Sequence, residues 1–242
     1  MVLDMEISFH LGSGNVGIQL KRVIEALSML QVKDVDNASL NYVKSLLAGL
    51  VAFTANDADK LFDEQKDVDE RAMVGCIYRY MYLIMLFKLC DMGLPDIDIE
   101  YDRMRGAGAE LCKKGFTSCN VTGCDLTKRK VCEEFILGQS GSLSKCKGCG
   151  RSVRPDLVIH ERNSNPGLGN GLVAEFKREK AQEMSVDLAK IQYFTCENGV
   201  LKYLIGAVVT LSKTKQNVVL YRNSEIVCHV SVYEDRVVYE HE

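Results

Sequence analysis

The spacing of hydrophobic positions changes twice in the middle of the chain. Residues 67–90 begin with acidic residues and then become apolar almost all round, which predicts a buried core helix. Residues 96–103 alternate strictly between polar and apolar side chains, as a strand does. Residues 183–194 return to helical spacing. This part of the chain therefore predicts a helix, then strands, then a second helix.

Two short apolar segments lie between these elements and read as paired strands. Residues 154–160 and 172–177 are joined by a loop rich in Gly, Asn and Pro. Because side chains alternate along a strand, Glu175 and Lys177 are expected on the same face. Pairing of the two strands would also bring Asp156 close to Glu175. Two carboxylates so placed repel each other unless a cation or a proton lies between them.

The remaining apolar segments predict helices near the N-terminus and strands near the C-terminus. The expected helices are residues 16–30 and 40–55. The expected strands are residues 203–211, 217–221, 226–233 and 236–240, and the last three form a meander. We expect no segment long enough to span a bilayer, since even the apolar part of 67–90 is short and interrupted by Arg79 and Lys88.

The order Pro155-Asp156, then Glu175-x-Lys177, resembles the signature of the PD-(D/E)XK nuclease superfamily. The resemblance implies an α/β, restriction-endonuclease-like fold with a mixed central sheet flanked by helices. It implies that Asp156 and Glu175 bind Mg²⁺ or Mn²⁺ and that Lys177 orients or activates the attacking water. In such enzymes an acid on the first helix often joins the metal site, and Glu70 matches it. The alternative for Glu70 is a helix N-terminal charge.

The resemblance also suggests how the chain is divided. We expect a helical N-terminal extension at 1–66 and a nuclease domain at 67–242, with a Cys-rich insert at 104–154. One branch of the superfamily, the RecB-like branch, carries Gln-x-x-x-Tyr on the second helix. Here Gln192 is followed four residues later by Cys196, so that motif is absent. A second Pro-Asp pair, Pro95-Asp96, has no well-placed partner.

The ten cysteines point to a second metal. In a chain without an export signal, clustered cysteines favour metal over disulfides. Cys146 and Cys149 have the spacing of two tetrahedral zinc ligands, and Cys119 and Cys124 are the expected second pair, with Cys112 and Cys132 as alternates. Unligated thiols and an iron–sulfur cluster are the other interpretations. The cysteines outside the insert are interpreted as core thiols, namely Cys76, Cys90, Cys196 and Cys228.

Charge is concentrated in this insert. The chain has a formal charge of −3, but residues 112–154 carry nine basic and three acidic residues, a balance of +6 that leaves −9 elsewhere. We expect the insert to neutralise phosphates while the carboxylates hold metal. The expected nucleic-acid contacts are Lys128, Arg129, Lys130, Lys145, Lys147, Arg151, Arg154, Lys190 and Gln192. The alternative is that these side chains are solvated and keep the insert and the helix soluble.

These patterns together predict an Mg²⁺- or Mn²⁺-dependent nuclease that hydrolyses phosphodiester bonds in DNA or RNA, with structural Zn²⁺. One alternative is a catalytically silent nucleic-acid-binding module, and another is a zinc-dependent interaction module. His160 is interpreted as an ordinary strand residue. The N-terminus has acids where a signal peptide would be basic, so we expect an intracellular protein, cytoplasmic or nuclear, without a membrane partner. A homodimer is left open.

Overall fold

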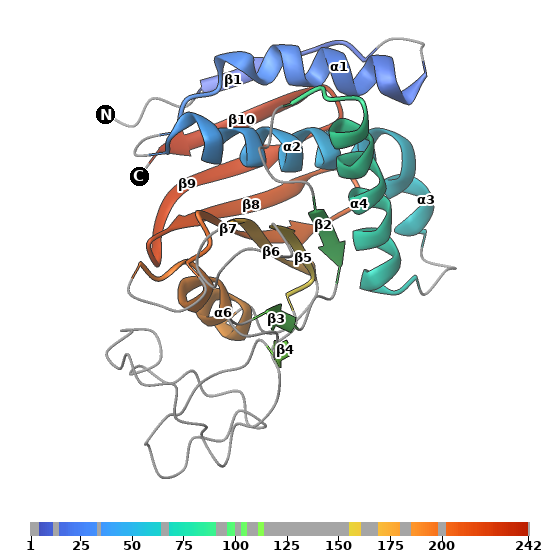
Figure 1. Cartoon of the computed structure of the whole chain (residues 1–242). Helices are drawn as coiled ribbons and strands as arrows, with labels where there is room; N and C mark the ends of the chain where they lie inside the picture. Colours follow the sequence, from blue (N-terminus) through green and yellow to red (C-terminus); the bar gives the residue numbers. More distant parts are fainter. Residues whose placement is uncertain are drawn as a thin grey trace.

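A mixed sheet of eight strands, with helices on both sides, organises the protein (Figure 1). The computed structural model describes residues 5–11, 15–32, 35–63, 68–90, 96–99, 103–105, 111–113, 155–160, 169–179, 185–197 and 202–241. The prediction of an α/β protein with a mixed central sheet flanked by helices is confirmed.

The strand order is β2-β5-β6-β7-β8-β9-β10-β1 across the sheet. Neighbours pair antiparallel except β6 and β7, which are parallel. The strands are β1 (Met5–Ser8), β2 (Asp96–Ile99), β5 (Leu157–His160), β6 (Asn170–Arg178), β7 (Ile205–Leu211), β8 (Gln216–Arg222), β9 (Glu225–Val232) and β10 (Arg236–His241). A separate pair is formed by β3 (Arg103–Arg105) and β4 (Leu111–Lys113).

The hairpin expected around the Pro-Asp and Glu-x-Lys motifs is present. β5 pairs antiparallel with β6, and Leu157 lies opposite Ala174. The chain then crosses over through α6 (Ser185–Thr195) before β7 joins β6 in parallel, as a parallel pair requires. The C-terminal strands form the predicted meander β8-β9-β10.

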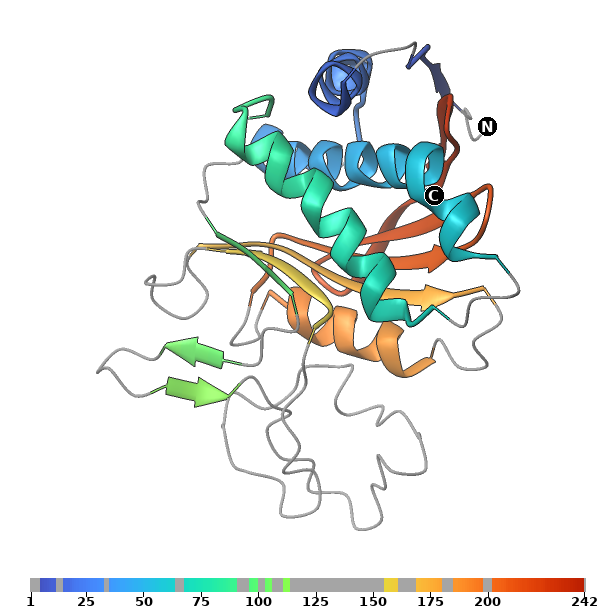
Figure 2. The ribbon, with the colours of Figure 1, turned by 90° about the vertical axis from the view of Figure 1, so that its right-hand side faces the viewer.

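The helices lie on opposite sides of the sheet, which Figure 2 shows edge-on. One side carries α2 (Asn37–Phe53) and α4 (Glu70–Leu86), with α1 (Val16–Ala26) packed on α2, and the other side carries α6. Short turns extend two of these helices: η1 (Leu27–Met29) follows α1, while η2 (Thr54–Ala58) and α3 (Asp59–Leu61) follow α2. Polar N-caps begin the helices, since Asn15, Asp36 and Asp69 each accept a hydrogen bond from a backbone N–H in the first turn.

The segment before residue 67 shares its hydrophobic core with the sheet. Leu46, Leu50 and Phe53 of α2 are fully buried in the same cluster as Phe176 and Val209. In addition, β1 forms one edge of the sheet by pairing with β10. The expectation of a helical extension thus describes its helices correctly, but among the described residues this segment is an integral layer, because α2 covers the central strands.

One helix of the described part is long and apolar enough to cross a membrane. It runs over Asn37–Leu61 with a mean hydropathy of 1.2 in its most apolar window, and 78% of that window is buried inside the protein. This differs from the expectation that no segment qualifies. Length and composition are weak evidence for a span, since the core helix of a globular protein satisfies the same criteria.

Candidate active site

Strand β6 divides its side chains between the two layers of the protein. Ala174 and Phe176 lie in the core formed with α2 and α4, whereas Val173 packs in the cluster beneath α6. Glu175 and Lys177 both contact side chains of α6. The prediction that these two residues share a face is therefore confirmed, and that face is the one covered by α6.

Asp156 is fixed directly before β5 by the backbone of β6. The Phe176 N–H donates a hydrogen bond of 2.7 Å to Asp156 Oδ2. Because Phe176 follows Glu175 in the chain, this bond holds the Asp156 carboxylate next to Glu175. The expected approach of Asp156 and Glu175 thus rests on a specific contact between the hairpin strands.

Glu175 is the most buried acid of this region, with no exposed surface. Its Oε2 accepts a hydrogen bond of 2.9 Å from Lys190 Nζ. Its Oε1 is buried and has no hydrogen-bond partner among the described residues. Since buried polar atoms are almost always paired, an oxygen left in this state marks a position where a further group can bind.

Lys177 lies between two acids from different helices. Its Nζ is 3.5 Å from Glu70 Oε1 and 3.4 Å from Asp187 Oδ2. Glu70 is the first residue of α4, and its other oxygen, Oε2, accepts a bond of 3.3 Å from the Arg178 N–H. Glu70 thus lies in the cluster, where it contacts the lysine and the end of β6.

Two residues of α6 complete the cluster. Asp187 is 3% exposed, and its Oδ1 accepts a bond of 2.8 Å from Lys190 Nζ. Asp187 was missed in the sequence, and Lys190 was expected only as a phosphate contact. Their spacing of three residues on a predicted helix places both side chains on one face, and this was the signal available.

The burial of these acids shifts their pKa values upward. Burial, opposed by the Phe176 N–H and by Lys190 and Lys177, raises the pKa of Asp156 to about 6. Burial and the neighbouring charge of Asp156 raise the pKa of Glu175 well above its ordinary value, although Lys190 opposes the shift. For Lys177, desolvation lowers the pKa, but attraction to Asp187, Glu70 and Asp156 outweighs it and the net pKa is raised. The site thus favours a bound cation or proton.

The pKa of Asp156 leads to a prediction about stability. At pH values between 3.8, the ordinary pKa of the carboxyl group, and about 6, the folded protein binds the Asp156 proton more tightly than the unfolded chain does. Stability from this group is greatest below that range and falls as pH rises through it. Without divalent metal, Asp156→Asn should therefore raise stability at pH 7.5 by up to about 3 kcal/mol, and by much less at pH 4.

Urea unfolding of both proteins in EDTA at the two pH values measures this difference. Asp235→Asn, a change at an exposed carboxylate, is the control and should show no such pH-dependent gain. If Asp156→Asn is less stable than the wild type at pH 7.5, burial of the charged Asp156 carboxylate does not destabilise the folded protein.

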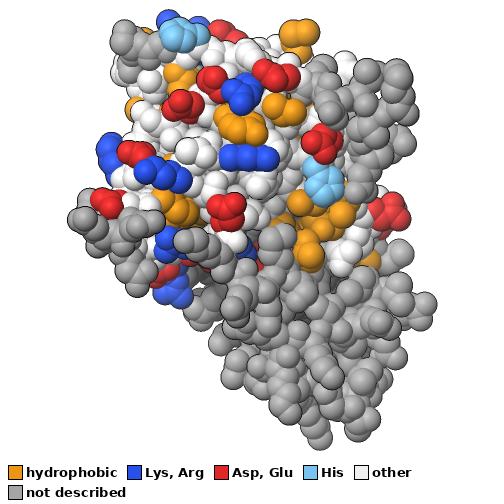
Figure 3. Space-filling view, turned by 180° about the vertical axis from the view of Figure 1, so that it is seen from behind, with side chains coloured by type: hydrophobic (Ala, Val, Ile, Leu, Met, Phe, Trp, Pro, Cys, Tyr) orange, Lys and Arg blue, Asp and Glu red, His pale blue; other side chains and the backbone are white. Residues whose placement is uncertain are grey.

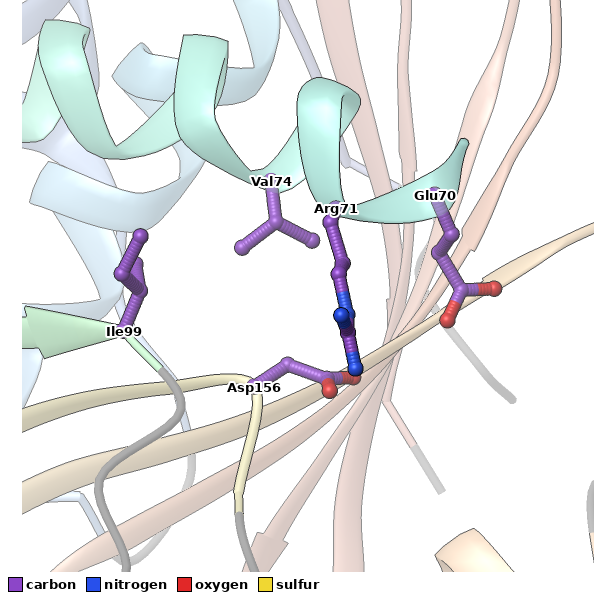
Figure 4. Close-up of a pocket in the computed structure, with 5 residues that line it drawn as sticks. All are labelled: Glu70, Arg71, Val74, Ile99 and Asp156. Carbon is purple, nitrogen blue, oxygen red and sulfur yellow. The ribbon is translucent and has the colours of Figure 1, made fainter. Parts of the chain in front are cut away.

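A pocket of about 200 Å³ opens beside these residues (Figure 4). Glu70, Arg71 and Val74 line it from α4, with Ile99 at the end of β2 and Asp156 before β5. The close-up shows the Arg71 side chain extending from α4 toward the side of the pocket where Asp156 lies. Of the candidate carboxylates, Asp156 and Glu70 line this pocket, whose other lining side chains are Arg71 on the polar side and Val74 and Ile99 on the apolar side.

His160 and Gln192 are not part of the cluster. His160 is 3% exposed at the far end of β5 from Asp156, and its Nε2 lies 2.8 Å from Asp98 Oδ2. This agrees with its interpretation as a strand residue. The Gln192 backbone carbonyl accepts a bond from Ser224 Oγ, and no described contact joins its side chain to the carboxylates.

The predicted zinc site lies outside the described residues. This applies to Cys119, Cys124, Cys132, Cys146 and Cys149, while Cys112 lies on β4 with a side chain that is not described. Among the described residues, no group of three or more His, Cys, Asp and Glu side chains has a metal-holding arrangement. Of the cysteines interpreted as core thiols, Cys228 is buried and the other three are partly exposed. Burial raises the pKa of the Cys228 thiol to about 12.

The basic residues expected to contact nucleic acid also lie mostly outside the described part. This applies to Lys128, Arg129, Lys130, Lys145, Lys147, Arg151 and Arg154. On the face shown in Figure 3, the described basic and acidic side chains alternate with hydrophobic ones. The described part of that face therefore offers no broad basic surface to a phosphate backbone.

Comparisons with protein-family models, with curated proteins and with solved structures found no match to this chain.

Proposed function

We propose that this chain is a metal-dependent nuclease that hydrolyses phosphodiester bonds in DNA or RNA. The observation that carries the proposal is the unpartnered Oε1 of Glu175, a fully buried carboxylate held beside Asp156. A buried acid of this kind needs a cation or a proton, and an oxygen left without a donor is an available ligand for an ion. Lys177, two residues along the same face, supplies the third member of the set.

The order of elements supports the finer proposal of a restriction-endonuclease-like fold. The chain runs from α4 through β2, β5 and β6 to α6 and β7, which is the order that the sequence resemblance implies. These strands are also neighbours in the sheet, in the order β2-β5-β6-β7. The motif residues thus lie on or directly before the second and third strands from the β2 edge, next to the crossover helix.

Each residue of the cluster has a separate role in this proposal. Asp156 and Glu175 would hold Mg²⁺ or Mn²⁺, which when bound supplies an activated water and offsets charge on the phosphoryl oxygens. Lys177 orients the attacking water. Glu70 and Asp187, each within 3.5 Å of the Lys177 ammonium, fix its position. In the described geometry Glu70 is thus a positioning residue for Lys177.

The Cys-rich insert is proposed to bind the phosphate backbone of the nucleic acid. Residues 112–154 carry the +6 balance, while the described cluster is acidic around its lysines. Structural Zn²⁺ at Cys119, Cys124, Cys146 and Cys149, or at the alternates Cys112 and Cys132, would hold such an insert together.

The decisive experiment compares the wild type with Lys177→Ala on labelled single- and double-stranded DNA and RNA. Each protein is incubated with Mg²⁺, with Mn²⁺ and with EDTA. We expect cleavage that requires metal and falls on the order of 100-fold or more in the variant, because misplacement of a reacting group costs about that much in rate.

Lys21→Ala is the matched control, since the Lys21 side chain is 65% exposed and pairs with Glu25 on the surface of α1. It should cleave like the wild type. Absence of cleavage on every substrate, with binding preserved, would favour the catalytically silent module. Equal cleavage by wild type and Lys177→Ala would place the reaction elsewhere or identify a contaminant.

A further inference from the structure

Lys190 holds an unusual position for a lysine of a helix facing a sheet. Its Nζ donates 2.9 Å to Glu175 Oε2 and 2.8 Å to Asp187 Oδ1, and its side chain is 19% exposed. Lys190 and Asp187 are three residues apart on α6, whereas Glu175 comes from β6. The ammonium thus bridges a helix carboxylate and the buried carboxylate of the strand.

The bridge neutralises a charge that burial alone would disfavour. A carboxylate without exposed surface is costly unless a cation or proton accompanies it. Lys190 supplies that cation at Oε2, while Oε1 has no partner in the described structure. A divalent ion bound to Glu175 would carry out the same neutralisation, and two cations within a few ångströms of each other repel strongly. The ion and the ammonium therefore compete for the same carboxylate.

Asp187 can keep its hydrogen bond with the Lys190 ammonium while an ion occupies Glu175. It is already within hydrogen-bond distance and lies one helical turn before Lys190, so the flexible lysine side chain can give up Glu175 without any movement of α6. Asp187 Oδ2 at the same time contacts Lys177 Nζ at 3.4 Å.

We propose that Lys190 occupies the cation position at Glu175 in the metal-free protein and is transferred to Asp187 alone when a divalent ion binds. This inference rests on the proposed metal site, and it adds an internal competitor that sets the affinity of that site. Lys190 is in this respect a positioning residue, and Asp187 is its anchor.

Titration with Mn²⁺ in the absence of nucleic acid, followed by the electron paramagnetic resonance of free Mn²⁺, measures the affinity directly. The proteins are the wild type, Lys190→Met and Lys177→Met. The two variants lose the same charge from the same cluster, but Lys177 contacts Glu70 and Asp187 instead of Glu175. We expect Lys190→Met to bind Mn²⁺ on the order of tenfold more tightly than the wild type, and Lys177→Met to show a clearly smaller gain.

Asp187→Asn provides the opposite test. Without its anchor the ammonium should remain on Glu175, so this variant should bind Mn²⁺ more weakly than the wild type. In the double variant Asp187→Asn/Lys190→Met most of that loss should disappear, because the competitor is gone. Lys190→Gln, which keeps a hydrogen-bond donor without charge, replaces Lys190→Met if the latter does not fold, and it should also bind more tightly than the wild type.

Equal gains in Mn²⁺ affinity for Lys190→Met and Lys177→Met would show that any lost positive charge in the cluster has this effect. That result would overturn the proposed transfer of Lys190 from Glu175 to Asp187. The proposed transfer would also be overturned if the double variant kept the full loss of Mn²⁺ affinity seen in Asp187→Asn. Both results leave the metal site itself intact. Absence of Mn²⁺ binding in every protein would instead overturn the metal-dependent function, and the proposed transfer with it.

Discussion

Replacing Glu175 with glutamine is expected to abolish metal-dependent cleavage while leaving the protein folded. The substitution keeps the size of the side chain and an oxygen for the Lys190 bond of 2.9 Å, but it removes the charge that would hold the ion. Loss of a metal-ligand charge costs several kcal/mol of transition-state stabilisation, so we expect cleavage to fall on the order of 10³-fold.

Folding of the variant is checked by thermal unfolding in EDTA. Because burial and the charge of Asp156 raise the pKa of Glu175 well above its ordinary value, the ionised carboxylate disfavours the folded state, and its neutral replacement should unfold at the same temperature as the wild type or higher. A Glu240→Gln variant, altered at an exposed acid of β10, should retain full cleavage. Substantial cleavage by Glu175→Gln would show that the buried carboxylate does not take part in the reaction.

Replacing Gly206 with alanine is expected to destabilise the protein and to disturb the candidate site through α6. A Cβ at this position of β7 would lie 2.5 Å from Ile191 Cγ2 and 2.7 Å from Thr195 Cγ2. Both neighbours are β-branched residues of a helix, and their χ1 angles have little freedom to yield. The helix must therefore move, at a cost of about 1–3 kcal/mol.

Urea unfolding measures this loss, and Gly75→Ala is the matched control. Gly75 lies within α4, and a Cβ there would meet nothing within 4 Å. Gly75→Ala should therefore stabilise the protein by about 0.5–1 kcal/mol, since alanine favours helix over glycine. Unchanged stability of Gly206→Ala would mean that α6 adapts without cost. We also expect Gly206→Ala to weaken cleavage, because α6 carries Asp187 and Lys190.

The hairpin of β5 and β6 could be predicted from the sequence because its signal is local. Alternation along residues 172–177 is sufficient to place Glu175 and Lys177 on one face, and the loop between the strands limits how they pair. Phe176 follows the same rule toward the opposite layer, where it is fully buried. Such short-range rules need no knowledge of which helix covers which face.

The residues that the sequence did not assign depend on contacts between distant elements. Asp187 looks like any acid in the first turn of a helix until α6 is placed over β6, where its carboxylate meets Lys177. The sequence predicts an extension before residue 67 because the resemblance to the nuclease superfamily begins there, while the partner of the apolar surface of this segment lies far along the chain. Strand β1, only four residues long, has too few positions for alternation to show.

The pairing of β1 with β10 has a consequence for the order of folding. Met5 lies opposite Tyr239, so this edge joins residues that are 234 positions apart. Helix α2 likewise contacts β6, β7 and β9, which all come much later in the chain. Contacts of such high sequence separation slow folding, because the entropy of loop closure is lost before the contacts form and stabilise the chain. The apolar surface of the N-terminal helices therefore stays exposed during folding until the C-terminal strands have formed. Because such exposed surface promotes aggregation, we expect folding to depend on chaperones more than the size of the protein suggests.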